Sequence, residues 1–211
     1  MGSLDVNLWS SSEHALRYLE RADTIPHRAE GEATLLDFLP ARIGRVLDLG
    51  TGDGRLLALV KRARPQASAV AVDFNVEMLA RLGERFAEDT GVQAIRHDMS
   101  NPLPALGRFD AVVSSFAIHH VSHERKRALY GEIFRALEPG GVFLNLEHVA
   151  SPTEALHQRF NDAIGVRPGE EDPSNKLLDV ETQLIWLREI GFGDVDCSWK
   201  WLELALLVAT R

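Results

Sequence analysis

The sequence predicts an α/β fold built on a doubly wound, mostly parallel β-sheet. Short, nearly continuous apolar runs recur from Arg45 onward, and such runs are typical of strands buried on both faces of a parallel sheet. Stretches with helical spacing of apolar residues separate these runs, so strand and helix alternate along the chain. Right-handed crossovers between the strands are then the default connection.

The predicted elements follow in order from the N-terminus. Residues 12–39 are expected to form two helices, with Ser10 to Ser12 as N-caps. A break is expected at Ile25, because the residue before a proline avoids the helical conformation. The second of these helices should end near Pro40. Strands are predicted at 46–49, 69–74, 93–99, 109–116 and 141–146, and helices between them at 54–64, 76–88 and 124–137.

The alternation breaks after residue 150. Residues 151–178 are expected to form an inserted cap over the sheet, with a helix at 154–163 and then a polar segment. This cap would be a mobile lid or, alternatively, a solvated loop without a function. Asp179 should cap a last helix that ends at Gly191. Strand-like runs at 194–199 and 202–210 are expected to pair antiparallel at the sheet edge.

The length suits a single domain. We divide residues 1–211 into an N-terminal helical segment (1–43), a ligand-binding core (44–150), the cap (151–178) and a C-terminal helix with a strand pair (179–211). The formal net charge of −8 weighs against nucleic acid or an anionic membrane as the main partner.

Cysteine content and hydropathy favour a cytoplasmic protein with no membrane partner. Cys197 is the only cysteine, so no disulfide can form within the chain, which fits a reducing compartment. No apolar run approaches the roughly 18 residues of a membrane span. The first residues lack the features of a signal peptide. The chain is expected to be a monomer or a homodimer.

A glycine-rich loop, Asp48-Leu49-Gly50-Thr51-Gly52-Asp53-Gly54, connects the first predicted strand to a helix. Free backbone N–H groups and the positive helix end can meet a polar ligand there. Alternate glycines allow the backbone to turn tightly and approach that ligand. A dinucleotide fingerprint would need a third glycine at Arg55, and no Gly-Lys-Ser/Thr follows for a phosphate loop. The loop therefore disfavours NAD and nucleoside triphosphates.

Two carboxylates accompany this loop. Asp73 ends the second predicted strand, where an acid can accept both hydroxyls of a ribose. Asp48 ends the first strand, where it can hold a cationic amino group. A ligand with an ammonium group, a ribose and an adenine, but no pyrophosphate, fits S-adenosylmethionine better than NAD.

Five segments in order resemble motifs of the class I S-adenosylmethionine-dependent methyltransferases. They are 46–54 with the glycine loop, 72–74 (Val-Asp-Phe), 97–99 (His-Asp-Met), 109–115 on the fourth strand and 137–141 before the fifth. The resemblance spans residues 44–146. It implies a Rossmann-like sheet of seven strands with the last one antiparallel, which agrees with the closing strand pair, and it implies S-adenosylmethionine as the cofactor.

The resemblance also implies which residues hold each part of the cofactor. The glycine loop would carry the amino-acid end and Asp73 the ribose hydroxyls. Phe74 would pack beside the adenine, Asp98 would face its amino group and Met99 its ring. Arg28 is expected to reach the cofactor carboxylate, the alternative being an ordinary surface arginine. The expected cofactor-binding residues are Asp48, Gly50, Thr51, Gly52, Gly54, Asp73, Phe74, Asp98, Met99, Ser114 and Arg28.

Candidate catalytic residues follow the fourth and fifth strands, where ligands bind in open α/β sheets. Methyl transfer is an in-line displacement that relies largely on positioning, and a base is needed only if the acceptor must lose a proton. His120 is one candidate. Glu147 and His148 are the other candidates, because burying a charged group at a strand end is costly and a function would explain that cost. These side chains with His119 include metal-ligand types, but nothing places them around one ion, so no metal is expected.

The leading interpretation is methyl transfer to a small-molecule acceptor. Residues 179–197 resemble the ends of methyltransferase homologues near the tRNA-uridine-modifying enzymes, which makes RNA the alternative acceptor. The acidic net charge and the lack of a basic stripe weigh against RNA. A third interpretation is a non-catalytic S-adenosylmethionine-binding protein, since a fold does not fix a function.

Overall fold

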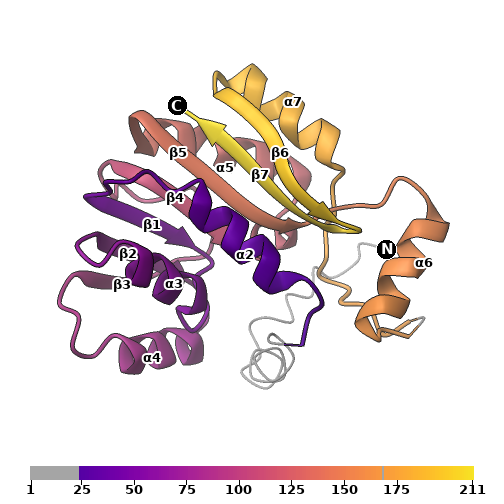
Figure 1. The fold of residues 1–211 in the computed structure, drawn as a ribbon, viewed down its shortest axis with the longest axis horizontal. Helices are drawn as coiled ribbons and strands as arrows, with labels where there is room; N and C mark the ends of the chain where they lie inside the picture. The colour runs from indigo at the N-terminus through magenta and orange to yellow at the C-terminus, as the bar shows by residue number, and fades with distance from the viewer. Residues whose placement is uncertain (1–23, 168) are drawn as a thin grey trace.

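A seven-stranded sheet in the order β3-β2-β1-β4-β5-β7-β6 forms the centre of the computed structural model, which describes residues 24–167 and 169–211 (Figure 1). Strands β1 to β5 pair in parallel, whereas β7 is antiparallel to both β5 and β6. The fold class predicted from the sequence is therefore confirmed. The strands are β1 (Arg45–Leu49), β2 (Ser68–Asp73), β3 (Val92–Arg96), β4 (Phe109–Ser115), β5 (Leu137–His148), β6 (Gly193–Trp201) and β7 (Leu204–Thr210).

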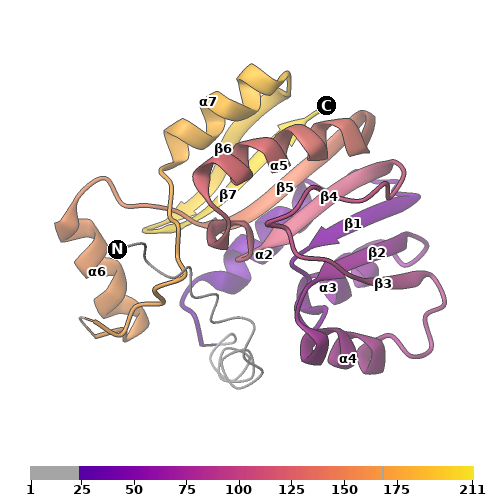
Figure 2. The ribbon, with the colours of Figure 1, turned by 180° about the vertical axis from the view of Figure 1, so that it is seen from behind.

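Helices cover both faces of this sheet (Figures 1 and 2). One face carries α2 and α3, and the other carries α5 and α7. The first helix predicted within residues 12–39 falls mostly outside the described residues, whereas the second is α2. The helices are α2 (Arg28–Asp37), α3 (Arg55–Ala63), α4 (Val76–Arg85), the short 3₁₀ helix η2 (Ile118–His120), α5 (His123–Ala136), α6 (Glu154–Ile164) and α7 (Val180–Ile190).

The apolar strands are buried on both faces because successive side chains point to opposite sides of the sheet. In β1, Val46 packs with Leu57 and Val60 of α3, while its neighbour Leu47 packs with Leu129 of α5 in the other core. Each of these five side chains is fully buried. A continuous apolar run is thus the physical requirement for a strand at the centre of a two-sided sheet.

Helix ends follow local sequence signals. The side chain of Asp179 accepts a hydrogen bond from the Thr182 N–H at 2.7 Å and so caps α7, as predicted. Gly191 ends that helix with a left-handed φ of 113°. Strand β3 ends at Arg96 rather than at residue 99, so His97 and the two residues after it lie in a loop beyond the sheet.

Helix α6 stands beyond the carboxyl end of β5, to the side of the sheet (Figures 1 and 2). Thr153 caps its start through a bond from the Leu156 N–H, and Gly165 ends it with a φ of 71°. The inserted helix predicted at 154–163 is therefore confirmed. Among the described residues, no helix has the length and apolar character needed to cross a membrane.

Candidate functional site

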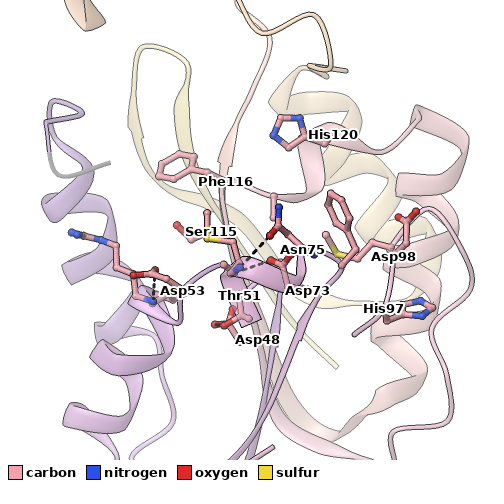
Figure 3. A pocket seen from close by; sticks show the side chains of 18 of the residues that line it. Asp48, Thr51, Asp53, Asp73, Asn75, His97, Asp98, Ser115, Phe116 and His120 are labelled. Atoms are coloured by element: carbon pink, nitrogen blue, oxygen red, sulfur yellow. Dashed lines mark hydrogen bonds between the residues drawn. The ribbon is translucent and has the colours of Figure 1, made fainter. Parts of the chain in front are cut away.

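A pocket opens at the carboxyl ends of β1, β2 and β4, which a parallel sheet brings to one edge (Figure 3). The glycine loop, the turns after β2 and β3 and the segment after β4 form its wall. Most residues predicted to bind the cofactor meet there. Those in the wall are Arg28, Asp48, Gly50, Thr51, Gly52, Asp73, Phe74, Asp98 and Met99.

The glycine loop is held against the sheet by its backbone. The N–H groups of Gly50 and Thr51 donate to the carbonyl oxygen of Val72 at 2.8 and 3.0 Å. Gly50 has a left-handed φ of 67°. A Cβ atom at this position would overlap the Cβ atom of Ala117, which follows β4. Glycine is therefore required here both by the backbone conformation and by the close approach of the neighbouring segment.

Gly54 has a different role from the other two loop glycines. It is absent from the pocket wall and occupies the N-cap of α3 with a φ of 82°. A Cβ atom there would lie 2.8 Å from the ring of Phe86, which follows α4. The sequence predicted a cofactor contact at Gly54, but the structure places this glycine where α3 begins and meets Phe86.

Asp48 is a buried acid with an unused acceptor atom. Its residue is 1% exposed, and its Oδ2 accepts a hydrogen bond from the Thr51 hydroxyl at 2.7 Å. Its Oδ1 has no hydrogen-bond partner among the described residues. Burial raises the pKa of Asp48 to about 7, with nearby Asp73 adding to the rise and the Thr51 bond opposing it. A buried acceptor of this kind is suited to a cationic donor on a ligand.

Asp73 joins the glycine loop to the turn after β2. Its Oδ2 accepts from the Gly52 N–H at 2.8 Å, and its Oδ1 accepts from the Asn75 N–H at 2.9 Å. Burial raises the pKa of Asp73, although these backbone hydrogen bonds oppose the rise. The Asn75 side chain in turn caps α4. The carboxylate thus fixes the shape of the pocket at the place where the ribose was predicted.

Ser114 does not face the pocket, which corrects the prediction for this residue. It is fully buried, and its hydroxyl donates to the carbonyl oxygen of Leu49 at 2.8 Å, between β4 and β1. The pocket wall contains Ser115 instead. Neighbouring residues of a strand point to opposite faces, so an error of one position reverses the side chain. The Ser115 hydroxyl oxygen is buried and has no hydrogen-bond partner among the described residues.

Arg28 and Arg55 share one carboxylate at the pocket. The Nε atoms of both arginines lie 2.9 Å from Oε1 of Glu32, and Arg55 also reaches Oε2 at 3.0 Å. Arg28 is 5% exposed and Glu32 is 3% exposed, while both arginines belong to the pocket wall. Two guanidinium groups therefore meet one buried carboxylate in the wall of the pocket.

The three candidate catalytic residues are separated by the structure. His120 lies in the pocket wall, whereas Glu147 and His148 do not. Glu147 is fully buried on the α5 side of the sheet, with its Oε1 2.6 Å from Nδ1 of His119. The Nε2 atom of His148 lies 2.9 Å from Oε2 of Glu203 on the chain before β7. The fifth strand therefore supplies a buried polar network behind η2 rather than groups in the pocket.

Three residues at the site were not expected from the sequence: Ser115, Asn75 and the cap residue Ser174, whose hydroxyl lies 3.0 Å from Nδ1 of His120. A signal existed for Asn75, because an asparagine just before a helical run is a common cap. No local signal marks Ser174. Within residues 24–167 and 169–211, no group of three or more His, Cys, Asp or Glu side chains is arranged to hold a metal ion.

His157 of α6 joins the cap to the end of the sheet. Its Nδ1 lies 2.8 Å from Glu203 and its Nε2 lies 3.2 Å from Glu171. The hydrogen bond to Glu203 raises the pKa of His157, and Glu171 adds to the rise. Because the pKa of His157 is higher in the folded chain, protonation of His157 stabilises the folded state. This stabilisation is fully present below the pKa of the unfolded chain, about 6.5, and is lost as pH rises through the pKa of the folded chain.

Replacing His157 by glutamine is therefore expected to lower the Tm more at pH 6 than at pH 8.5. Thermal unfolding of the wild type and H157Q across this range measures the difference. H97Q is the matched control, since the ring of His97 is hydrogen-bonded to the carbonyl oxygen of Asn101, which is a neutral partner. A Tm difference that stays constant or grows above pH 8 would contradict the assignment.

Part of the chain is similar to known methyltransferases. Residues 46–141 match the family described as "Methyltransferase domain". A demethylmenaquinone methyltransferase of Thermus thermophilus is 38% identical over 115 residues, which are 53% of this chain and 50% of that protein. Another protein of that name, from Clavibacter sepedonicus, is 28% identical over 179 residues, which are 78% of this chain and 71% of that protein.

A solved structure shows the same fold. The O-methyltransferase family protein from Burkholderia thailandensis superposes with a TM-score of 0.74 at 20% identity, over 97% of this chain and 61% of that one. The chain spans about half the length of the Thermus relative. The sheet order, the ordered motifs around the pocket and the match over residues 46–141 make this part of the chain similar to class I S-adenosylmethionine-dependent methyltransferase domains.

Proposed function

We propose that the chain is a methyltransferase that uses S-adenosylmethionine to methylate a small molecule by in-line displacement. One observation carries this proposal. A single pocket combines the glycine loop, the unused acceptor atom of Asp48 and the carboxylate of Asp73 with a second wall of Phe116, Ala117 and His120. The first group suits the methyl donor, and the second leaves room for an acceptor beside it.

The residues of the pocket fit the cofactor part by part. Asp48 would hold its ammonium group, and Arg28, which lies in the pocket wall, would reach its carboxylate. Asp73 would accept the ribose hydroxyls, while Phe74 and Met99 would enclose the adenine near Asp98 (Figure 3). When bound, S-adenosylmethionine supplies an electrophilic methyl group on a sulfonium ion. The protein's contribution is to orient both reactants and to exclude water.

The acceptor side of the pocket favours a small, partly apolar molecule. Phe116, Ala117 and Val121 form an apolar wall, and His120 adds a polar atom to it. The cap segment covers this side through its contact with His120. The relatives named above are methyltransferases of demethylmenaquinone, a small molecule, and the net charge of −8 disfavours RNA.

Calorimetry and a transfer screen test the proposal. The wild-type chain should bind S-adenosylmethionine and S-adenosylhomocysteine but not NAD. Methyl transfer should then appear in a screen of phenols, amines, thiols and RNA. NAD binding without S-adenosylmethionine binding would overturn the proposal. Cofactor binding with no transfer would indicate a non-catalytic protein, and tRNA binding that weakens with salt would indicate an RNA substrate.

Asp73→Ala is expected to weaken S-adenosylmethionine binding by about 10–100-fold, because charge-assisted hydrogen bonds contribute roughly 1.5–3 kcal/mol. The variant loses the ribose acceptor and also the bond that holds the Gly52 N–H. Calorimetric Kd values measure the effect. Asp89→Ala is the control, since Asp89 pairs with Lys61 away from the pocket. Equal Kd values for D73A and the wild type would disprove the ribose role.

A further inference from the structure

We infer that two cap residues, Asp172 and Ser174, position His120 as the proton acceptor of the reaction, and that the methyl acceptor is therefore a hydroxyl compound. The inference rests on the proposed function and extends it to the acceptor class. Asp172 and Ser174 are positioning residues, since they act through His120. They lie in the segment between α6 and α7, more than fifty residues after His120 in the chain.

A hydrogen-bonded chain connects the three side chains. The Ser174 hydroxyl donates to Oδ1 of Asp172 at 2.6 Å. The Ser174 hydroxyl oxygen also lies 3.0 Å from Nδ1 of His120. The hydroxyl has one proton, and the carboxylate is the stronger acceptor for it. Nδ1 of His120 must then carry the proton that it donates to Ser174. This arrangement leaves the lone pair of the neutral ring on Nε2.

His120 lies where the Nε2 lone pair can accept a proton from a molecule in the pocket. The residue lies in the pocket wall, and Figure 3 shows its ring at the opposite end of the pocket from Asp48. Burial lowers the pKa of His120 well below its usual value, and the neighbouring His119 ring, at 4.0 Å, adds to the decrease. The imidazole is therefore neutral near pH 7 and is able to accept a proton.

Asp172 stabilises the ring once it is protonated. Its charge opposes the decrease in the pKa of His120, and the Ser174 hydroxyl transmits this effect at hydrogen-bond distance. An acid that orients an imidazole and stabilises the imidazolium is an established device in catalysis. His119 stays neutral, because burial lowers its pKa well below the usual value, and its Nδ1 is bonded to Glu147.

Hydrogen bonds hold the cap segment in the position where Ser174 contacts His120. The Lys176 N–H donates to the carbonyl oxygen of His119 at 2.8 Å, and Nζ of Lys126 donates to the carbonyl oxygen of Lys176 at 3.3 Å. Nε2 of His123 lies 3.1 Å from the carbonyl oxygen of Leu177. Ser174 itself is 4% exposed. These contacts hold the segment against η2 and the start of α5.

A proton acceptor in this place selects the acceptor chemistry. The acceptor hydroxyl gives its proton to Nε2 of His120 while its oxygen bonds to the methyl carbon. The carbon–sulfur bond breaks, and its electron pair remains on the sulfur. His120 then releases the proton to water. Phenols fit this pattern, because the apolar wall of Phe116 and Val121 suits an aromatic ring.

The tautomer of His120 tests the geometry without any substrate. Long-range ¹H–¹⁵N NMR of the histidine-labelled chain at pH 7 should show a neutral His120 with its proton on Nδ1, the signal being assigned with H120Q. In S174A the ring should move toward the other tautomer or a mixture. A wild-type His120 protonated on Nε2 would overturn the inference, since that atom would then be a donor.

Kinetics test the consequence for methyl transfer. With a phenol as the acceptor, S174A and D172N should lower kcat by about 10–100-fold, which is less than the roughly 100–10,000-fold contribution of a general base because both residues act through His120. The KM for S-adenosylmethionine should stay within about twofold, because this pair does not belong to the pocket wall that holds the cofactor. S174T keeps the hydroxyl and should restore kcat. S68A is the matched control, since Ser68 begins β2 and its hydroxyl donates to the backbone carbonyl oxygen of Gly44, and neither residue belongs to the pocket wall.

The outcomes separate this inference from the proposed function. If the wild type does not bind S-adenosylmethionine, the proposed function is contradicted. The NMR experiment still tests the contact between Ser174 and His120 in that case. An unchanged kcat in S174A, or transfer only to thiols or amines, overturns the inference and leaves the methyltransferase function intact. If S174A melts below the assay temperature, the comparison of S174T and D172N with the wild type decides.

Discussion

Replacing Glu147 by alanine is expected to lower the free energy of unfolding by about 3–5 kcal/mol, the usual cost of removing one partner of a buried charged network. Glu147 is fully buried, and its Oε1 accepts from Nδ1 of His119 at 2.6 Å and from the His148 N–H at 2.9 Å. Burial lowers the pKa of Lys126, which is also fully buried, and the negative charge of Glu147 opposes this decrease. Removing the carboxylate leaves the ammonium group and the imidazole without this acceptor in a dry interior.

Chemical denaturation of E147A and the wild type at pH 7 measures this effect. E138A is the control on the same strand, because Glu138 is partly exposed, and its change should stay within about 0.5 kcal/mol. E147Q keeps the shape and one oxygen acceptor, so it should lie between the wild type and E147A. A loss of activity in E147A without a loss of stability would contradict the structural role and return Glu147 to the catalytic candidates.

Replacing Gly50 by alanine is expected to lower the free energy of unfolding by about 2–5 kcal/mol and to abolish measurable cofactor binding. A left-handed backbone costs an L-residue about 1–2 kcal/mol. Overpacking adds about 1–3 kcal/mol, because the new Cβ atom would overlap the Cβ atom of Ala117, which cannot rotate away. The loop would have to move from Val72, whose carbonyl oxygen holds the Gly50 N–H.

Gly165→Ala isolates the contribution of the contact. Gly165 ends α6 with a φ of 71°, close to the 67° of Gly50, but a Cβ atom there would meet nothing within 4 Å. It should therefore show only the backbone cost of about 1–2 kcal/mol. Denaturation curves and calorimetry with S-adenosylmethionine compare the two variants. Equal losses in G50A and G165A would show that the contact with Ala117 does not matter.

The sequence by itself determined the order of strands and helices and most of the cofactor side of the pocket. Both depend on local signals: apolar runs for buried strands, caps such as Asp179 and glycines at backbone turns. Parallel strands bring their carboxyl ends to one edge, so residues at those ends, such as Asp48 and Asp73, had to meet. Their positions followed from chain order alone.

Only the tertiary structure decided which side chains face the pocket beside His120. Strand register sends Ser115 rather than Ser114 to the pocket wall and directs Glu147 into the core under α5. The pairing of Ser174 with His120 joins residues far apart in the chain. Periodicity reports on neighbours within a few residues, whereas these outcomes depend on how the cap docks and how the strands pair. The contacts argued to favour a hydroxyl acceptor are therefore created by the fold and carry no local signature in the sequence.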